Sequence, residues 1–213
     1  MGYVECHSHL LPFVDDGVKT KEQALRVLHA YKDAGFSIVV TTPHLYNPLV
    51  VTHVDNIRTM YRWLEGEGKK LGIRVVLGSE TFVGSASHPK NLPFLGNFVL
   101  VEVDTSVEPL YLLNYAYTLI KSGHFVILAH IERYDWFSEK SLVVKRLVEM
   151  GVFFQSNCDA VLSGTVDSYL NKRMIDIIAG DNHGDDTLPA RLAASLQKHP
   201  EVLQRMERLF ETE

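Results

Sequence analysis

The sequence predicts an α/β fold of parallel strands and, within that class, a β/α barrel that forms a single domain over residues 1–213. Three observations support this prediction: a repeated helix–glycine–strand pattern, about seven strand-like runs, and helices between nearly all of those runs. No glycine-rich dinucleotide turn follows the first run, which favours a barrel over an open doubly wound sheet.

The repeated pattern places a glycine between each helix and the strand that follows. It occurs in "YKDAGFSIVV", "GKKLGIRVVL", "LIKSGHFVIL" and "LVEMGVFFQS". We expect Gly35, Gly72, Gly123 and Gly151 to end their helices in the left-handed conformation, because glycine adopts positive φ without a steric penalty.

The helices also carry start signals, and the strands between them are short and apolar. Thr20 with Gln23 predicts a capping box, Pro109 suits a first helical position, and Ser138 is a candidate cap for the helix that follows it. The expected strands are residues 3–6, 37–42, 74–77, 98–103, 125–129, 152–155 and 176–179.

Composition excludes several classes of function. The formal net charge is -5, and no run of Lys or Arg forms a surface for nucleic acid. The most apolar stretch, "LPFLGNFVLVEV", meets acidic residues long before the ~20 apolar residues that span a bilayer, so we expect no membrane insertion. Cys6 and Cys158 are too few for a disulfide framework, and no export signal is evident, so we expect a cytoplasmic protein.

Ionisable residues gather where the predicted strands end. In parallel α/β folds the carboxyl ends of the strands form one rim, and active sites are built there. This rule brings together residues spread over most of the chain: His7, His9, His44, Glu80, Glu102, His130, Asp181 and His183.

The residue types on this rim predict a metal site. In "HSH" and "DNH" the partners lie two residues apart, so in an extended chain both side chains of a pair face the same way. Several imidazoles interleaved with carboxylates, without thiolate, suit Mn²⁺, Fe²⁺ or Zn²⁺. Asp15 and Asp16 fit either this site or an ordinary Asp-Asp-Gly turn.

The remaining histidines are expected to have other roles. His124 precedes its strand, and His29 and His199 belong to helical segments, so a structural role is favoured for all three. His53 and His88 lie in or beside connections after the second and third strands, where a plain loop role is favoured over contact with substrate.

Taken in order and spacing, "HSHLLPFVDDG", "TPH", "GSE", "VEV", "AHIERY" and "DNH" resemble the polymerase-and-histidinol-phosphatase (PHP) superfamily. The "DDG" and "AHIERY" segments resemble more narrowly the bacterial manganese-dependent protein-tyrosine phosphatases of capsule and exopolysaccharide operons. The resemblance covers nearly the whole chain. It implies a distorted seven-stranded β/α barrel, in agreement with the strand count.

The resemblance also implies a site for three Mn²⁺ ions, with Fe or Zn as alternatives. The first ion would take His7, His9, Glu80 and Asp181; the second would take Glu80, Glu102 and His130; the third would take Asp16, His44 and His183. Arg133 matches the family's phosphate-holding arginine, and Arg191 only loosely matches a second arginine. The connections after strands two and three are shorter than is typical for the family, and substrate choice is expected to depend on them.

Such a site suits phosphoester hydrolysis. Clustered divalent ions lower the pKa of bound water toward ~7 and neutralise phosphoryl oxygens. A metal-bound hydroxide would attack phosphorus, Arg133 would hold the non-bridging oxygens, and His44 or His183 is the candidate acid for the leaving group. A cysteine-dependent phosphatase is excluded, because neither cysteine begins a C-x₅-R motif.

Three functions remain open from the sequence. The favoured one is a protein-tyrosine phosphatase, and the second is a phosphatase or phosphodiesterase of small metabolites, histidinol phosphate included. The third is a non-catalytic metal-binding PHP domain. The complete set of metal ligands argues against this third function. The resemblance implies a phosphotyrosine protein as partner, such as a bacterial tyrosine autokinase, and the sequence makes no prediction of oligomeric state.

Overall fold

Parallel strands alternate with helices in the computed structural model, which describes residues 2–85 and 89–210. The strands are β1 (Tyr3–Glu5), β2 (Phe36–Thr41), β3 (His44–Leu45), β4 (Arg74–Leu77), β5 (Glu80–Phe82), β6 (Phe98–Glu102), β7 (Phe125–Leu128), β8 (Phe153–Asn157) and β9 (Ile177–Ala179). The helices are α1 (Lys21–Asp33), α2 (Val54–Leu71), α3 (Leu110–Lys121), α4 (Leu142–Glu149), α5 (Cys158–Leu162), α6 (Asp167–Asn171), α7 (Leu188–Lys198) and α8 (Pro200–Phe210), with a 3₁₀ turn, η1, at Ile131–Arg133. His88 lies outside the described residues.

The strands form two sheets, so the expected closed barrel of seven strands is not confirmed. One sheet has the order β1-β2-β4 and the other the order β3-β5-β6-β7-β8-β9, and all neighbouring strands are parallel. Two short strands, β3 and β5, were not expected from the sequence. Each follows a longer strand after two residues, and Pro43 between β2 and β3 has no N–H for a sheet hydrogen bond.

Backbone hydrogen bonds connect the carboxyl ends of β1, β2 and β9. Ser8 forms an isolated parallel bridge with Asn182, and Asp181 N–H donates to the His7 carbonyl at 2.8 Å. On the other side, Thr42 N–H donates to the Ser8 carbonyl at 2.7 Å. The segment after β1 is therefore held between residues far along the chain, and this fixes the position of its histidines.

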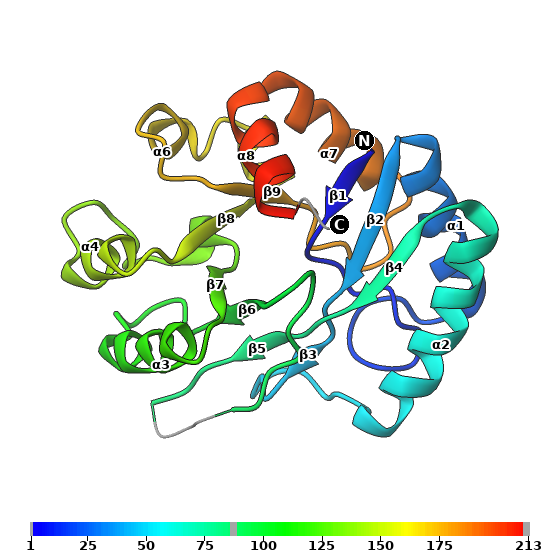
Figure 1. Ribbon diagram of the computed structural model, residues 1–213, viewed down its shortest axis with the longest axis horizontal. Coiled ribbons are helices and arrows are strands. Elements are labelled where there is room, and N and C mark those ends of the chain that lie inside the picture. Colours follow the sequence, from blue (N-terminus) through cyan, green and yellow to red (C-terminus); the bar gives the residue numbers. More distant parts are fainter. Residues whose placement is uncertain (1, 86–88, 211–213) are drawn as a thin grey trace.

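Helices cover the outside of the strands, as Figure 1 shows for α1 and α2 beside β2 and β4, and for α3 and α4 beside β6 and β7. α8 packs against β1 and β9. All five residues of β6 are buried, as expected for a strand covered on both faces. Within the described ranges, none of the helices combines the length and the apolar character needed to cross a bilayer.

The helix ends confirm most of the expected signals. Thr20 is the N-cap of α1, and its hydroxyl accepts a hydrogen bond from Gln23 N–H at 3.1 Å. The prediction for Ser138 was wrong: Ser141 caps α4, accepting from Val144 N–H at 3.1 Å. Pro109 occupies the N-cap of α3, one residue before the expected position. The four glycines expected at helix ends all have positive φ: Gly35, Gly72, Gly123 and Gly151.

Two glycines of α2 differ in their surroundings. A Cβ at Gly68 would lie 2.6 Å from Val75 Cγ2 and 2.8 Å from the Ile73 carbonyl oxygen. A Cβ at Gly66 would have no heavy atom of the described chain within 4 Å, apart from its own helix backbone and chain neighbours. Gly68 therefore lets α2 approach β4 closely, whereas Gly66 has no such role.

The two glycines should respond in opposite ways to alanine. Gly68→Ala is expected to lower the free energy of unfolding by about 1–3 kcal/mol, because the backbone of residue 73 cannot move away as a flexible side chain would. Gly66→Ala is expected to raise it by about 0.5–1 kcal/mol through helix propensity. Urea unfolding of both variants measures the difference, and equal shifts would contradict the close contact between α2 and β4.

Candidate metal centre

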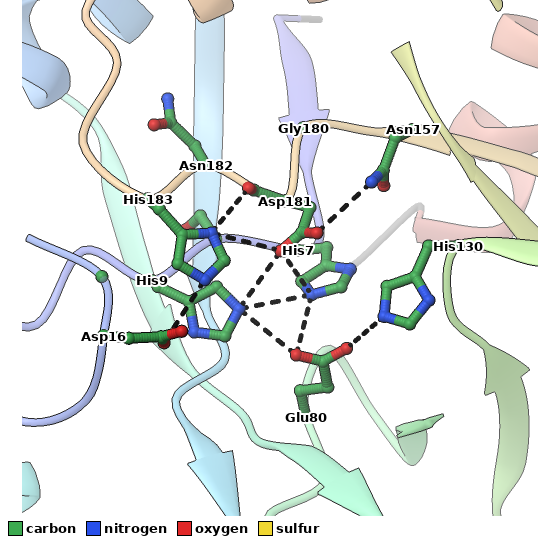
Figure 2. Close-up of polar contacts among 12 residues, drawn as sticks. His7, His9, Asp16, Glu80, His130, Asn157, Gly180, Asp181, Asn182 and His183 are labelled. Atoms are coloured by element: carbon green, nitrogen blue, oxygen red, sulfur yellow. Dashed lines mark hydrogen bonds and ion pairs between the residues drawn. The ribbon is translucent and has the colours of Figure 1, made fainter. Parts of the chain in front are cut away.

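The ionisable residues picked out in the sequence meet at the carboxyl ends of the strands. Each is placed by a strand or by the turn that follows it: His7 and His9 follow β1, His44 begins β3, Glu80 begins β5, Glu102 ends β6, His130 follows β7, and Asp181 and His183 follow β9. Figure 2 labels six of these residues, all but His44 and Glu102, and shows them directed toward one another together with Asp16 and Asn157. The sequence rule that gathered them is therefore supported by the geometry.

Four of these side chains form a buried group, which we call the inner cluster: His7, His9, Glu80 and Asp181. Both imidazole Nε2 atoms lie 3.3 Å from Glu80 Oε2, and 3.3 Å and 3.4 Å from Asp181 Oδ1. The two Nε2 atoms are 3.4 Å apart. Four potential ligand atoms thus surround one small volume, which is the arrangement expected around a single cation.

The carboxylates of the inner cluster carry a further sign of a cation site. Glu80 Oε2 and Asp181 Oδ1 are buried and have no hydrogen-bond partner among the described residues. A buried carboxylate oxygen without a donor is costly, because it has lost its water and gained no hydrogen bond. A metal ion at the centre of the cluster would satisfy both atoms, so the residues fit such an ion.

A second group lies nearer the solvent, and we call it the outer cluster: His9, Asp16, His44 and His183. Asp16 Oδ1 is 3.5 Å from His44 Nε2 and 3.4 Å from His183 Nε2. The Asp16 side chain is 50% exposed and that of His183 is 34% exposed. The outer cluster brings together the three residues expected for the third ion, with His9 added, and it faces outward.

A third group differs from the expected second set. His44, Glu80 and Glu102 form it, with His44 Nδ1 at 3.1 Å from both Glu80 Oε2 and Glu102 Oε1. His130 Nε2 lies 2.8 Å from Glu80 Oε1 but 3.9 Å from Glu102 Oε2. His130 therefore contacts Glu80 closely, while His44 takes the position between the two carboxylates.

Three polar residues orient the clusters: Asp15, which the sequence left open between this site and a turn, and Gln155 and Asn157, which it did not single out. Asp15 Oδ2 lies 2.9 Å from His9 Nδ1, Gln155 Oε1 lies 3.1 Å from His7 Nδ1, and Asn157 Nδ2 donates to Asp181 Oδ2 at 3.3 Å. Gln155 and Asn157 are alternate residues of β8, so both face the same side of the strand. The signal available for them was the pair of amide residues two positions apart in "FFQSN", which an extended chain places on one face.

The hydrogen bonds of Gln155 fix the proton on His7. The Gln155 Oε1 atom accepts from the backbone N–H of His130 at 2.9 Å, and its Nε2 donates to Asn157 Oδ1 at 2.8 Å. Because Oε1 is an acceptor, His7 Nδ1 must donate to it, which leaves the Nε2 lone pair of a neutral His7 directed into the inner cluster. Metal-binding histidines are usually held in this way by a partner on the other nitrogen.

Without a bound metal ion, charge interactions across the inner cluster shift the pKa values of its residues. Burial lowers the pKa of His7, but Glu80 and Asp181 outweigh it and raise the pKa to about 9. Burial also lowers the pKa of His9, yet hydrogen bonds to Asp15, Asp181 and Glu80 outweigh it and raise the pKa well above the usual value. Burial raises the pKa of Glu80, but His7 and His130 hold it well below its usual range. Protons on the histidines therefore compensate the buried negative charge.

The two histidines expected as candidate acids lie in different environments. Burial lowers the pKa of His44, but hydrogen bonding to Glu102 and the charge of Glu80 give a net increase. Burial and the charge of His9 lower the pKa of His183, whose Nδ1 donates to the Asp181 carbonyl at 2.9 Å. His183 therefore presents an unprotonated Nε2 to the outer cluster, as a ligand would.

The two arginines expected at the site have different surroundings. Arg133, in η1, forms an ion pair through Nη2 with Asp181 Oδ2 and has a side chain that is 50% exposed. Arg191 pairs with Asp159 at 2.9 Å and with Asp185 at 3.0 Å, and its Nη1 donates to Thr187 Oγ1. Each guanidinium nitrogen of Arg191 thus has a partner outside the clusters, whereas Arg133 contacts the inner cluster directly.

Comparison with known proteins places these features in a family. The family model described as "Capsular polysaccharide synthesis, CpsB/CapC" matches residues 3–206. The tyrosine-protein phosphatase CpsB of Streptococcus agalactiae is 25% identical over 210 residues, covering 89% of this chain and 86% of the relative. A putative tyrosine-protein phosphatase, CapC of Staphylococcus aureus, is 26% identical over 204 residues, covering 89% of this chain and 80% of the relative.

Solved structures share the fold. One, from work on YwqE of Bacillus subtilis and CpsB of Streptococcus pneumoniae, described as "unique metal-dependent tyrosine phosphatases", matches with a TM-score of 0.82 at 21% identity, covering 98% of this chain and 94% of that chain. Histidinol phosphate phosphatase from Lactococcus lactis, solved with zinc, L-histidinol and phosphate, matches with a TM-score of 0.57 at 11% identity, covering 96% of this chain and 94% of that chain. The family model spans nearly the whole chain and confirms the resemblance found in the sequence, so this protein belongs to the CpsB/CapC family of capsular polysaccharide synthesis.

Proposed function

We propose that this protein is a metal-dependent protein-tyrosine phosphatase. The observation that carries the proposal is the set of linked clusters, in which Glu80 belongs to two groups, one with Asp181 and the other with Glu102. The CpsB and CapC relatives named as tyrosine-protein phosphatases support the substrate. We also propose that residues 1–213 form one domain, in which β2–β3 and β4–β5 are interrupted strands of a distorted seven-stranded barrel.

The donor set favours Mn²⁺, with Fe or Zn as alternatives, because it mixes imidazole and carboxylate without thiolate. The inner cluster would hold one ion, Glu80, Glu102 and His130 a second, and Asp16, His44 and His183 a third. The position of His44 between Glu80 and Glu102 makes it a further candidate for the second ion. When bound, such ions supply activated water and neutralise the phosphoryl oxygens.

The chain's own residues would hold and orient the reacting groups. Arg133 is exposed on one side and contacts Asp181 on the other, so its remaining N–H groups can hold non-bridging phosphoryl oxygens beside the inner cluster. Asp15 and Gln155 keep the Nε2 atoms of His9 and His7 directed into that cluster. Phenolate is a better leaving group than an alkoxide, so a tyrosine ester needs little help from a general acid.

The position of the clusters favours a large substrate over an enclosed metabolite. Asp16, His183 and Arg133 are partly exposed, whereas the inner cluster behind them is buried. A phosphate held on a polypeptide can approach such an outward-facing site without entering a closed cavity. We therefore propose a phosphotyrosine protein as substrate, with a bacterial tyrosine autokinase as the candidate partner and the cytoplasm as the location.

Hydrolysis of phosphotyrosine peptides should depend on bound metal. The purified protein loaded with Mn²⁺ is expected to release phosphate from such peptides, and chelation should abolish the activity until metal is restored. His130→Ala should reduce the activity by at least about 100-fold, because it removes the close partner of Glu80. Turnover of histidinol phosphate without turnover of phosphopeptides would show that the substrate is a metabolite instead.

The two arginines provide a matched pair for testing phosphate binding. Arg133→Ala is expected to lower kcat/KM for a phosphotyrosine peptide on the order of 100-fold, as loss of one preorganised charge-stabilising group does. Arg191→Ala should leave kcat/KM within roughly threefold and lower the free energy of unfolding by up to about 1 kcal/mol. Steady-state kinetics and urea unfolding separate the two effects, and a large kinetic loss in Arg191→Ala would restore the role first expected for it.

Metal affinity should rise with pH because a cation must displace protons from the inner cluster. With its pKa raised to about 9, His7 is protonated at neutral pH in the chain alone, and it loses this proton on binding metal. The apparent affinity for Mn²⁺ should therefore increase from about pH 6.5 to about pH 8.

Calorimetric titration in buffers of different ionisation heat measures the released protons directly. Binding should release at least about one proton per protein near neutral pH. His53→Gln, which changes an exposed histidine at the start of α2, should give the same proton release as the wild type. Binding of Mn²⁺ without proton release would show that the histidines of the inner cluster are already neutral.

A further inference from the structure

Two exposed aromatic residues flank the clusters with unusual backbone conformations. Phe13 is 50% exposed with φ of 63°, and it precedes Asp15 by two residues. Tyr46 is 58% exposed with φ of 64°, and it follows His44 by two residues. A bulky residue at positive φ is strained, and such residues persist where the surrounding structure holds them in place, often at ligand sites.

Hydrogen bonds hold the loops that carry these two rings. His53 N–H donates to the Val14 carbonyl at 2.7 Å, and Asn56 Nδ2 donates to the Phe13 carbonyl at 2.9 Å, so the loop after β1 is tied to the start of α2. Asn47 Nδ2 donates to Glu102 Oε1 at 2.8 Å, which ties the loop after β3 to a carboxylate of the third group. Both rings are thus presented from anchored loops beside the clusters.

The two segments that carry these rings contain no Asp, Glu, Lys or Arg. Residues 10–14 read "LLPFV" and residues 45–54 read "LYNPLVVTHV", with no Asp, Glu, Lys or Arg. Leu49 is 92% exposed and Val51 is 75% exposed, so the apolar surface extends beyond the aromatic rings. Exposed apolar surface of this kind commonly marks a binding site, and here it borders a strongly charged one.

We propose that Phe13 and Tyr46 form an aromatic rim that packs against the aryl ring of phosphotyrosine while its phosphate lies at the clusters. This inference rests on the proposed function and names the residues that select aryl over alkyl phosphate esters. The rim supplies contacts that an aromatic ring can use and that a hydroxylated or charged metabolite cannot. Loss of one ring should weaken binding of an aryl ligand about tenfold, because aromatic contact adds to the buried apolar area.

Two phosphonates separate the contribution of the ring from that of the phosphate. Phenylphosphonate and methylphosphonate carry the same charged group, and only the first has a ring. Calorimetric titration of the Mn²⁺-loaded protein should show tighter binding of phenylphosphonate. Phe13→Ala and Tyr46→Ala should each weaken this binding about tenfold while the Kd of methylphosphonate changes less than roughly twofold.

Two further variants serve as controls. Tyr46→Phe keeps the ring and should retain wild-type binding of phenylphosphonate. Tyr117→Ala removes an aromatic side chain of α3 that is 54% exposed, and it should affect neither ligand. If either rim variant loses both phosphonates equally, the ring supports the metal site instead of the aryl group, and the proposal is overturned.

Kinetics with a phosphotyrosine peptide distinguish this inference from the proposed function. In Phe13→Ala and Tyr46→Ala, KM should rise about tenfold and kcat should change little, because the rings contact the substrate equally in the bound ground state and in the transition state. Unchanged KM and phenylphosphonate binding in both variants, with active wild type, would refute the rim and leave the phosphatase proposal intact. A wild type that binds phenylphosphonate through the rim but hydrolyses no phosphotyrosine peptide would refute the phosphatase proposal alone.

Discussion

Glu80 and Asp181 place two carboxylates in a volume from which water is excluded, and the arrangement of the site depends on how this charge is balanced. Burying a charge is costly unless an opposite charge and hydrogen bonds accompany it. His7 and His9 provide positive charge by holding protons, as the raised pKa values of both imidazoles show. A divalent cation can replace those protons and bind the buried oxygens directly, so the cluster suits metal exchange with proton release.

This balance requires strand ends from distant parts of the chain to meet accurately, and the short strands β3 and β5 contribute to it. The sequence predicted the seven other strands, because buried parallel strands tend to be continuous apolar stretches rich in Val, Ile and Phe. It did not predict β3 and β5, which are two and three residues long and carry His44 and Glu80. Neither "HL" nor "ETF" is a continuous apolar run, and the pairing of these strands arises only when neighbouring strands are in register. His44 and Glu80 marked the site, although their polar side chains at the start of β3 and β5 gave no sign of a strand.

All residues of the clusters except Asp16 could be found from the sequence because one topological rule applies to them, whereas the supporting residues Gln155 and Asn157 could not. The positions of Asp15, Gln155 and Asn157 follow from individual side-chain hydrogen bonds, for which strand order gives no rule. Arg191 is a residue that the sequence suggested and the structure places elsewhere. It follows "DNH" in the sequence and loosely matches the family's second arginine, but in the folded chain it pairs with Asp159, more than thirty residues earlier. Proximity in sequence to a site residue is weak evidence for side chains on helices that face outward.

Backbone strain connects the clusters with the aromatic rim. Six non-glycine residues of the described chain have positive φ, and four of them, Phe13, Tyr46, His130 and Asp181, lie in the turns that follow β1, β3, β7 and β9. Each such conformation is expected to cost about 1 kcal/mol or more, so the parallel strands and their covering helices must stabilise it. His130 and Asp181 use this conformation within the clusters, and Phe13 and Tyr46 use it beside them. The same scaffold thus holds strained residues for two purposes, and within the described ranges neither Phe13 nor Tyr46 belongs to the hydrophobic core or to the side chains packed against it.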